Sequence, residues 1–272
     1  MTLDEALLHL HQLPAIPAVV QELVASFSAP VVDIEKLANK IGQDQALTSK
    51  VLRVSNSSFY GYPRKIASLQ DAVIIMGLSG VRSLVLSAGF IRVFGQEAGG
   101  ALNRVEYWKR SLRVATYAKA VAQCFKQSPE TAFTAGLLHD IGQLVLDVCL
   151  PEQYVQVLAY VEAESCSLSA AEDAVLGFQH DALGAAVARR WNFPTVIEQA
   201  IRDCHRPDMR ALEALSVVVC IAVRLDQGDP PASLVSRVAV EYQDYLGPEA
   251  GRLIPMLPEE EQLEAITASL LG

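Results

Sequence analysis

The sequence predicts an all-α protein built from two helical bundles. Apolar residues recur at helical spacing along most of the chain, small polar residues stand where helices would begin, and no strand-like alternation stands out. Hydrophobic residues make up 51% of the 272 residues and charged residues only 19%, against a globular average of about 25% charged. Such a chain buries a large core and is not disordered.

The first hundred residues are expected to form a succession of short helices. An apolar stripe at i, i+3, i+4 and i+7 spacing runs from Ile16 to Phe27 and predicts the first amphipathic helix. Small polar residues that can accept hydrogen bonds from a first helical turn mark four further helix starts, at Asp33, Asp44, Ser68 and Ser79. Gly77 is expected to end the helix that Ser68 begins.

The second half predicts longer helices after a loop rich in glycine and small residues at 95–100. A long helix is expected over 103–126, and Ser128 and Pro129 open the next one. Three later helix starts are expected at Ser169, Pro194 and Asp208, with Ser169 and Glu172 forming a capping box. We therefore predict bundles at 1–100 and 101–240 and a helical extension at 241–272.

The charge of the chain is acidic and unevenly distributed. The formal net charge is −9, and residues 241–272 carry seven acidic side chains against Arg252 alone. Non-specific nucleic-acid binding needs clustered Lys and Arg, and the basic residues of the long predicted helix, Lys109, Arg113 and Lys119, are spread around it. The sequence thus favours neither a nucleic-acid partner nor a membrane.

Several features favour a cytoplasmic location. The N-terminus opens with acidic residues, whereas a signal peptide would carry Lys or Arg. The apolar stretch 72–91 has Arg82 at its centre, which is costly in a bilayer. The five cysteines are odd in number and lack C-x-x-C spacing, so reduced thiols are expected.

A series of short motifs resembles one known family. In chain order they are Leu13-Pro14-Ala15-Ile16-Pro17, Leu37-Ala38, Asp44-Gln45-Ala46-Leu47, Asn56-Ser57, Tyr60-Gly61 and Val81-Arg82. Together they look like the N-terminal bundle of the HDOD family, a regulatory branch of the HD phosphohydrolase superfamily. The resemblance covers about residues 10–228, with Gln45 where the family usually has Pro. It implies an HDOD-specific bundle followed by a degenerate HD-like bundle.

The resemblance extends to a metal site of which only part is present. HD hydrolases hold divalent metals with an early His, a His-Asp pair and a late Asp, and the metal activates water against a phosphodiester. This chain has the pair as His139-Asp140, and His180 and His205 resemble further ligands. Taken alone, a His-Asp pair at a helix end is more often a cap or a satisfied core pair.

Two positions that carry ligands in the superfamily are lost. The early His corresponds to Arg110 and the late Asp to Val223, and neither side chain can ligate a metal. Helical spacing turns Arg110 inward, where its charge needs a carboxylate such as Asp140 or Asp181. We hypothesise that the guanidinium stands where a metal would. No catalytic residue, metal or other cofactor is therefore expected.

The favoured function is a stand-alone, non-catalytic module that contacts a protein partner in a bacterial signalling pathway, and a homodimer is compatible with it. Asn56, Tyr60 and Tyr62 are the candidate contact residues, although a packed loop explains them as well. One alternative is a metal-dependent phosphohydrolase or phosphodiesterase on nucleotides or cyclic dinucleotides, with a reduced ligand set. The other is a pocket that binds a nucleotide at Arg110 without cleaving it.

Overall fold

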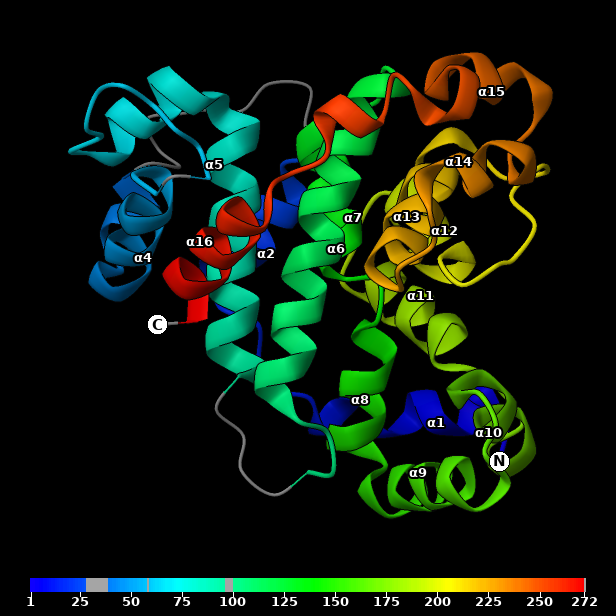
Figure 1. The fold of residues 1–272 in the computed structure, drawn as a ribbon. Coiled ribbons are helices and arrows are strands. Elements are labelled where there is room, and N and C mark those ends of the chain that lie inside the picture. Colours follow the sequence, from blue (N-terminus) through cyan, green and yellow to red (C-terminus); the bar gives the residue numbers. More distant parts are fainter. Residues whose placement is uncertain (28–38, 58, 96–99, 272) are drawn as a thin grey trace.

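The computed structural model describes residues 1–27, 39–57, 59–95 and 100–271, and within these ranges the chain is all-α, as the sequence predicts. An isolated bridge between Met209 and Val238 is the β-type pairing there. The elements in chain order are α1 (Leu3–Leu8), η1 (His9–Gln12), α2 (Ala18–Ala25), α4 (Gln45–Ser55), α5 (Leu69–Phe94), α6 (Arg104–Cys124), α7 (Pro129–Leu137), α8 (Ile141–Cys149), α9 (Pro151–Glu164), α10 (Leu168–Val175), α11 (His180–Arg190), α12 (Thr195–Asp203), α13 (Ala214–Asp226), α14 (Pro231–Leu234), η2 (Val235–Arg237), α15 (Val240–Leu246), η3 (Pro248–Ala250), η4 (Ile254–Met256) and α16 (Glu260–Leu271) (Figure 1).

Three of the predicted helix starts, at Asp44, Ser68 and Ser128, are confirmed by side-chain caps. Asp44 accepts a hydrogen bond from the backbone N–H of Leu47 at 3.0 Å, and Ser68 accepts one from Asp71 at the same distance. Ser128 caps α7, with Pro129 in the first turn. Gly77 has φ 76° and ψ 163°, which are not helical, so the helix that Ser68 begins is interrupted there as expected, and a second helical stretch follows within α5. A residue with a Cβ would be strained in that conformation.

Two predicted starts are wrong, and one lies outside the described residues. The helix expected at Ser169 is capped by Ser167 instead, which frees Glu172 for another role. Asp208 does not open a helix, because its carboxylate binds Arg210 in a loop and α13 begins only at Ala214. The predicted cap Asp33 falls within the undescribed range 28–38.

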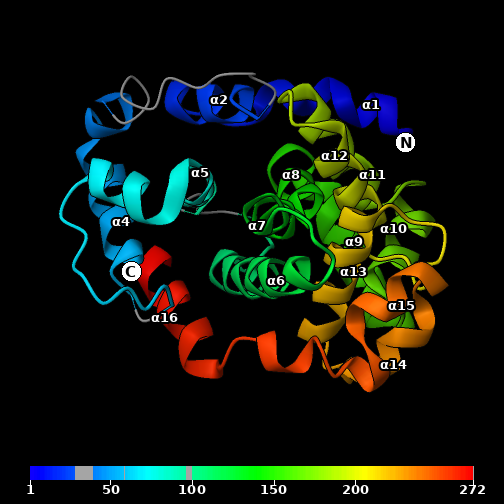
Figure 2. The ribbon, with the colours of Figure 1, turned by 90° about the horizontal axis from the view of Figure 1, so that it is seen from above.

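Helix α7 lies at the centre of the molecule and contacts α5, α6, α12 and α13 (Figure 2). Its side chains Phe133 and Ala135 are fully buried in a continuous hydrophobic core. That core includes residues from both predicted bundles, and the division at residue 100 stays a prediction. A second cluster joins α8, α9, α10 and α11 to α1.

The acidic C-terminal extension returns to the first half of the chain. After α14 and α15 it crosses the molecule, and α16 packs against α4, α5 and α6 (Figure 2). Leu263, Ile266 and Leu270 are the buried side chains of this helix. Its acidic residues Glu260 and Glu261 occupy the first turn, where they complement the helix dipole.

Two helical stretches of the described chain are long and apolar enough to cross a membrane. One is α5 and the other runs from Pro129 to Cys149, and most of the apolar window in each is buried, 61% and 94% respectively. The central helices of a globular core have the same properties. Length and apolarity are therefore weak evidence for a membrane span here.

Candidate functional site

The His139-Asp140 pair stands in the short turn between α7 and α8. Asp140 is the N-cap residue of α8, yet its carboxylate makes no capping hydrogen bond. Gly142, the second residue of α8, lets this helix approach α11 so closely that a Cβ there would overlap the backbone oxygen of His180. This close approach brings the pair to the face of α11 that carries His180.

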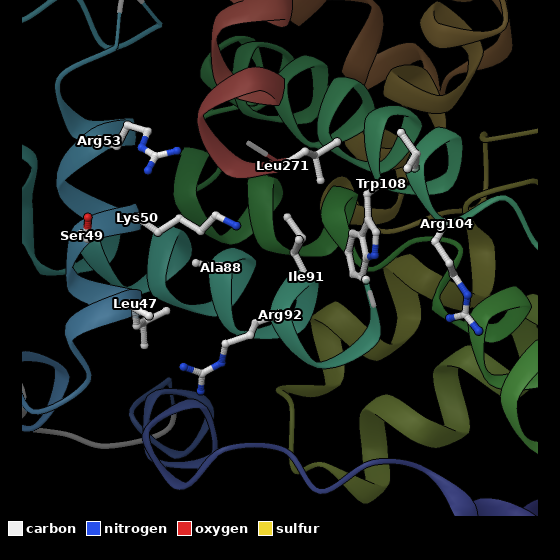
Figure 3. A pocket seen from close by; sticks show the side chains of 13 residues that line it. Leu47, Ser49, Lys50, Arg53, Ala88, Ile91, Arg92, Arg104, Trp108 and Leu271 are labelled. Carbon is white, nitrogen blue, oxygen red and sulfur yellow. The ribbon is translucent and has the colours of Figure 1, made fainter. Parts of the chain in front are cut away.

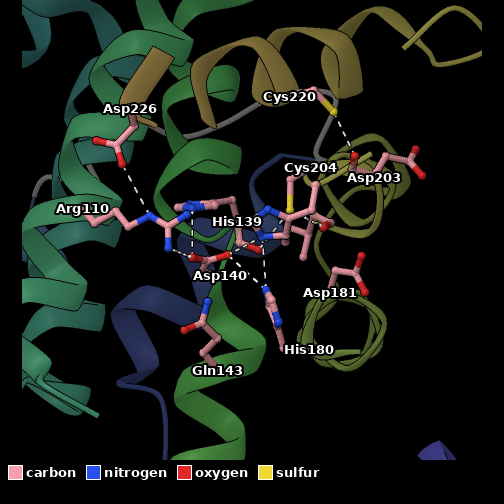
Figure 4. A network of polar contacts seen from close by, with 12 residues as sticks. Arg110, His139, Asp140, Gln143, His180, Asp181, Asp203, Cys204, Cys220 and Asp226 are labelled. Carbon is pink, nitrogen blue, oxygen red and sulfur yellow. Dashed lines mark hydrogen bonds and ion pairs between the residues drawn. The ribbon is translucent and has the colours of Figure 1, made fainter. Parts of the chain in front are cut away.

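The carboxylate of Asp140 is surrounded by four cationic or imidazole groups (Figure 4). Its Oδ1 lies 2.7 Å from Nε2 of His205 and 3.3 Å from Nε2 of His180. Its Oδ2 lies 3.2 Å from Nε2 of His139 and 3.2 Å from the guanidinium of Arg110. We call these five residues the Asp140 cage. The structure thus brings together all four predicted residues of the site and Arg110.

The cage holds Asp140 ionised despite its burial. Asp140 is only 1% exposed. Burial by itself works to raise the pKa of this carboxyl, but the neighbouring His139 and His205 outweigh it and hold the pKa well below its usual range. A buried carboxylate at neutral pH must be matched by positive charge nearby.

Two histidines of the cage have pKa values that are shifted in opposite directions. Burial opposes protonation of His180, but hydrogen bonds to Asp140 and Glu172 raise its pKa to about 10. Nδ1 of His180 lies 2.7 Å from Oε2 of Glu172, and the backbone N–H of His180 donates to the same carboxylate at 3.0 Å. Burial lowers the pKa of His205. These opposite shifts favour the cationic form of His180 and disfavour that of His205.

Arg110 comes from α6 and bridges two acidic side chains. Besides Asp140, it approaches Asp226 at the end of α13, at 3.5 Å. Arg113, one turn along α6, binds the other oxygen of Asp226 at 2.7 Å. Asp181, the second partner considered for Arg110, instead lines a pocket beside His205, and burial raises the pKa of its carboxyl.

Sequence reasoning missed two acidic residues of the site. Glu172 resembles a capping-box residue, which concealed its contact with His180 eight residues later. Asp226 lies one helical turn after Val223, where no acid was expected. The i, i+3 spacing of Arg110 and Arg113 on α6 is the sequence signal that points to a shared carboxylate.

The carboxylates in and beside the cage each contact a cationic side chain. Three acidic side chains, Asp140, Glu172 and Asp226, face three cationic ones, Arg110, Arg113 and His180. A divalent cation at Asp140 would have to displace Arg110 or lie beside its positive charge. Buried charge is costly unless it is compensated, so this set leaves little electrostatic attraction for a metal.

The donor atoms also fit a divalent metal poorly. Asp140, Cys204 and His205 offer ligand atoms that lie within 4.8 Å of one another. The Cys204 thiol is fully buried, however, and burial first of all raises its pKa well above the usual range, which disfavours the thiolate. Val223, at the position of the late acid, is a buried apolar residue.

One feature is nevertheless typical of metal ligands. Nδ1 of His139 lies 2.7 Å from the carbonyl oxygen of Gly136, and its buried Nε2 has no hydrogen-bond partner among the described atoms. Metal-binding histidines commonly donate their second nitrogen to a carbonyl in this way. This feature makes one residue, His139, resemble a metal ligand. Two other ligand positions of the superfamily are occupied by Arg110 and Val223, which cannot bind a metal.

The three candidate contact residues lie together at the end of α4. The side-chain amide of Asn56 donates to the carbonyl oxygens of Leu52 and Ile66, and its Oδ1 accepts from the backbone N–H of Ile66. Asn56 therefore fixes the loop that follows α4. Tyr60 and Tyr62 stack at 5.8 Å, and both are partly exposed. Lys119 lies 4.6 Å above the Tyr60 ring.

Comparison with known proteins places this geometry in context. A family model for the HDOD domain matches residues 13–207. An uncharacterized protein of Treponema pallidum is 25% identical over 238 residues, which are 85% of this chain but only 46% of that relative. The chain therefore spans about half the length of this curated relative.

Solved structures with the same architecture extend over nearly the whole chain. A crystal structure of an HDOD domain protein of unknown function from Geobacter sulfurreducens has a TM-score of 0.78 and 26% identity, covering 95% of this chain and 92% of its own. A protein from Shewanella amazonensis that has been proposed to be a phosphohydrolase has a TM-score of 0.76 and 22% identity, covering 97% of both chains. The second likeness concerns the fold alone.

Proposed function

Because the chain belongs to the HDOD domain family, we propose that it is a non-catalytic regulatory module that contacts a protein partner in bacterial signal transduction. The observation that carries this proposal is the ion pair of 3.2 Å between Arg110 and Asp140. A metal-dependent phosphohydrolase needs such a carboxylate to hold the ion that activates water. Here the carboxylate is matched by a guanidinium, which cannot activate water.

The same pairing argues against a nucleotide bound at Arg110. Its guanidinium already faces Asp140 and Asp226, and Arg113 shares the second of these acids. A phosphate at this place would meet two carboxylates. The approach of like charges in a partly buried site is unfavourable.

The alternative is a metal-dependent phosphohydrolase or phosphodiesterase on nucleotides or cyclic dinucleotides. His139 favours it, because its Nε2 makes no hydrogen bond among the described atoms and lies 3.2 Å from Oδ2 of Asp140. The reduced ligand set would be His139, Asp140 and His180. Arg110 would have to leave the carboxylate before this set could hold a metal.

A turnover assay separates the two functions. The full chain is incubated with bis(p-nitrophenyl) phosphate and added Mn²⁺, Ni²⁺ or Zn²⁺, with Asp140→Asn as the background control. We expect wild type and Asp140→Asn to release p-nitrophenol at the same rate. Metal-dependent turnover in wild type that the substitution abolishes would support the alternative and reject a non-catalytic module.

Partner contact is tested at the stacked tyrosines. Tyr62→Ala removes half of the stack from a partly exposed loop, whereas Tyr160→Ala removes an aromatic ring that is 38% exposed on α9. Affinity capture from the native cytoplasm, followed by reconstitution with the purified partner, should show weaker binding for Tyr62→Ala alone. Equal binding of both variants would place the contact elsewhere. A homodimer would be seen as self-association of the wild type.

A further inference from the structure

A second polar region is centred on α4, which contributes no residue to the Asp140 cage. A pocket of about 450 Å³ opens between α4, α5, α6 and the end of α16 (Figure 3). Lys50 and Arg53 enter it from α4, Ile91 from α5, Trp108 from α6 and Leu271 from α16. We call it the cationic pocket. Its volume lies within the range of small-molecule sites in proteins, about 300–1,000 Å³.

Two of its cations are not neutralised. Lys50 and Arg53 stand at i and i+3 on one face of α4, and their charged ends point into the pocket. Neither has an ion pair or side-chain hydrogen bond among the residues that the structure describes. The other two cations that line the pocket are matched, Arg92 by Asp44 and Arg104 by Asp147.

The environment of Lys50 shows that these charges are held at a cost. Burial is the main cause that lowers the pKa of its amine, and the charge of neighbouring Arg53 lowers it further. An anion between the two side chains would reverse both effects. The chain as a whole has a net charge of −9, so this local excess of positive charge is not a general property of its surface.

The far wall of the pocket is apolar. Ala88, Ile91 and Leu271 form it together with Trp108, which is 1% exposed. The indole Nε1 of Trp108 is buried and has no hydrogen-bond partner among the described atoms. A buried donor without a partner is unusual in a native protein. The pocket thus offers two charges and an apolar surface.

We propose that the cationic pocket binds a phosphomonoester of nucleotide size, with the phosphate between Lys50 and Arg53 and the apolar part against Ile91 and Leu271. A phosphate dianion matches the two cations in charge, and the planar guanidinium of Arg53 can bind two of its oxygens. An apolar ring system suits the opposite wall. An extended polyanion such as a nucleic acid would need a row of cations, which two residues on α4 do not provide.

Isothermal titration calorimetry on the full chain tests the proposal, with adenosine 5′-monophosphate, adenosine and inorganic phosphate as probes. We expect the monophosphate to bind more tightly than either other probe. Lys50→Gln and Arg53→Gln should each raise its Kd by about tenfold. Lys65→Gln removes an exposed charge outside the pocket and should leave the Kd unchanged.

Ser49→Glu provides a second route, because it keeps both cations and places a carboxylate next to Lys50 on an exposed helical position. It too should weaken binding of the monophosphate. A Kd for the monophosphate above about 1 mM in wild type would overturn the proposal. So would equal affinities for adenosine and its monophosphate, or an unchanged affinity in the Lys50 and Arg53 variants.

Discussion

The Asp140 cage and the cationic pocket hold their charges in opposite ways. In the cage, the single carboxylate, that of Asp140, is contacted on both oxygens, by Arg110 and by histidines. In the pocket, Lys50 and Arg53 face a cavity without a carboxylate partner in the described chain (Figure 3). The charge of Asp140 is thus compensated within the chain, whereas an added anion would compensate the charges of Lys50 and Arg53.

This difference changes where ligand binding is expected. The residues that resemble a metal site satisfy one another, because Arg110 supplies the positive charge that a metal would bring. The region with unpaired cations lies instead between α4, α5, α6 and the end of α16. Its cations Lys50 and Arg53 fall within residues 13–207 that match the family model, whereas Leu271 lies beyond them. Resemblance to a catalytic motif and capacity to bind a ligand are thus separate properties of this chain.

The largest expected effect comes from removing the central charge of the cage. Asp140→Asn keeps the shape of the side chain but leaves Arg110 and His180 with less compensation, so we expect a loss of about 3–5 kcal/mol in the free energy of unfolding. Urea denaturation measures it. Asp208→Asn breaks an exposed pair with Arg210 and should leave stability unchanged. Similar losses in both variants would show that the cage is not electrostatically coupled.

The next effect concerns the approach of two helices that builds the cage. Gly142→Ala places a methyl group against the backbone oxygen of His180, and we expect it to destabilise the chain by about 2–3 kcal/mol. Gly42→Ala is the matched control, since its added Cβ would meet only Leu69 at 3.9 Å. If thermal denaturation shows equal stability for the two variants, α8 and α11 are not as tightly apposed as the structure has them.

The free energy of unfolding should depend on pH through the histidines of the cage. His180 has a pKa of about 10 in the folded chain against 6.5 when unperturbed. Its stabilisation is therefore complete below pH 6.5 and is lost as the pH rises toward 10. The lowered pKa of His205 acts in the opposite direction, below pH 6.5. We expect a loss on the order of 1–2 kcal/mol between about pH 7 and about pH 9.

Glu172→Gln checks the origin of this loss, because Glu172 helps to keep His180 protonated. Urea denaturation of this variant at the same two pH values should show a smaller decrease than wild type. An equal decrease would assign the pH dependence to groups outside the cage.

The smallest effect is expected in the pocket. Lys50→Gln and Arg53→Gln remove charges that have no partner in the described chain, so without added ligand stability should change by no more than about 0.5 kcal/mol. Melting temperatures in a buffer without phosphate measure this. A clear loss of stability would mean that these cations already serve a structural role, and the contrast with the cage would disappear.

The sequence predicted the local features well and the long-range ones in part. Caps such as Asp44 and Ser68 act within one helical turn, so the chain itself specifies them. The inward direction of Arg110 followed from helical spacing, but its contact with Asp226 depends on how α6 packs against α13. Glu172 and Lys50 show the same limit, because their roles arise only when separate helices meet.

The central claim is that the guanidinium of Arg110 takes the place of a metal at Asp140. Its most direct test is the content of Mn, Fe, Ni and Zn in purified wild type, measured beside Arg110→His, which returns an imidazole to that position, and Arg113→His as its matched control. We predict substoichiometric metal in wild type and in Arg113→His, and more metal in Arg110→His. Near-stoichiometric metal in wild type that disappears in His139→Ala would contradict the account.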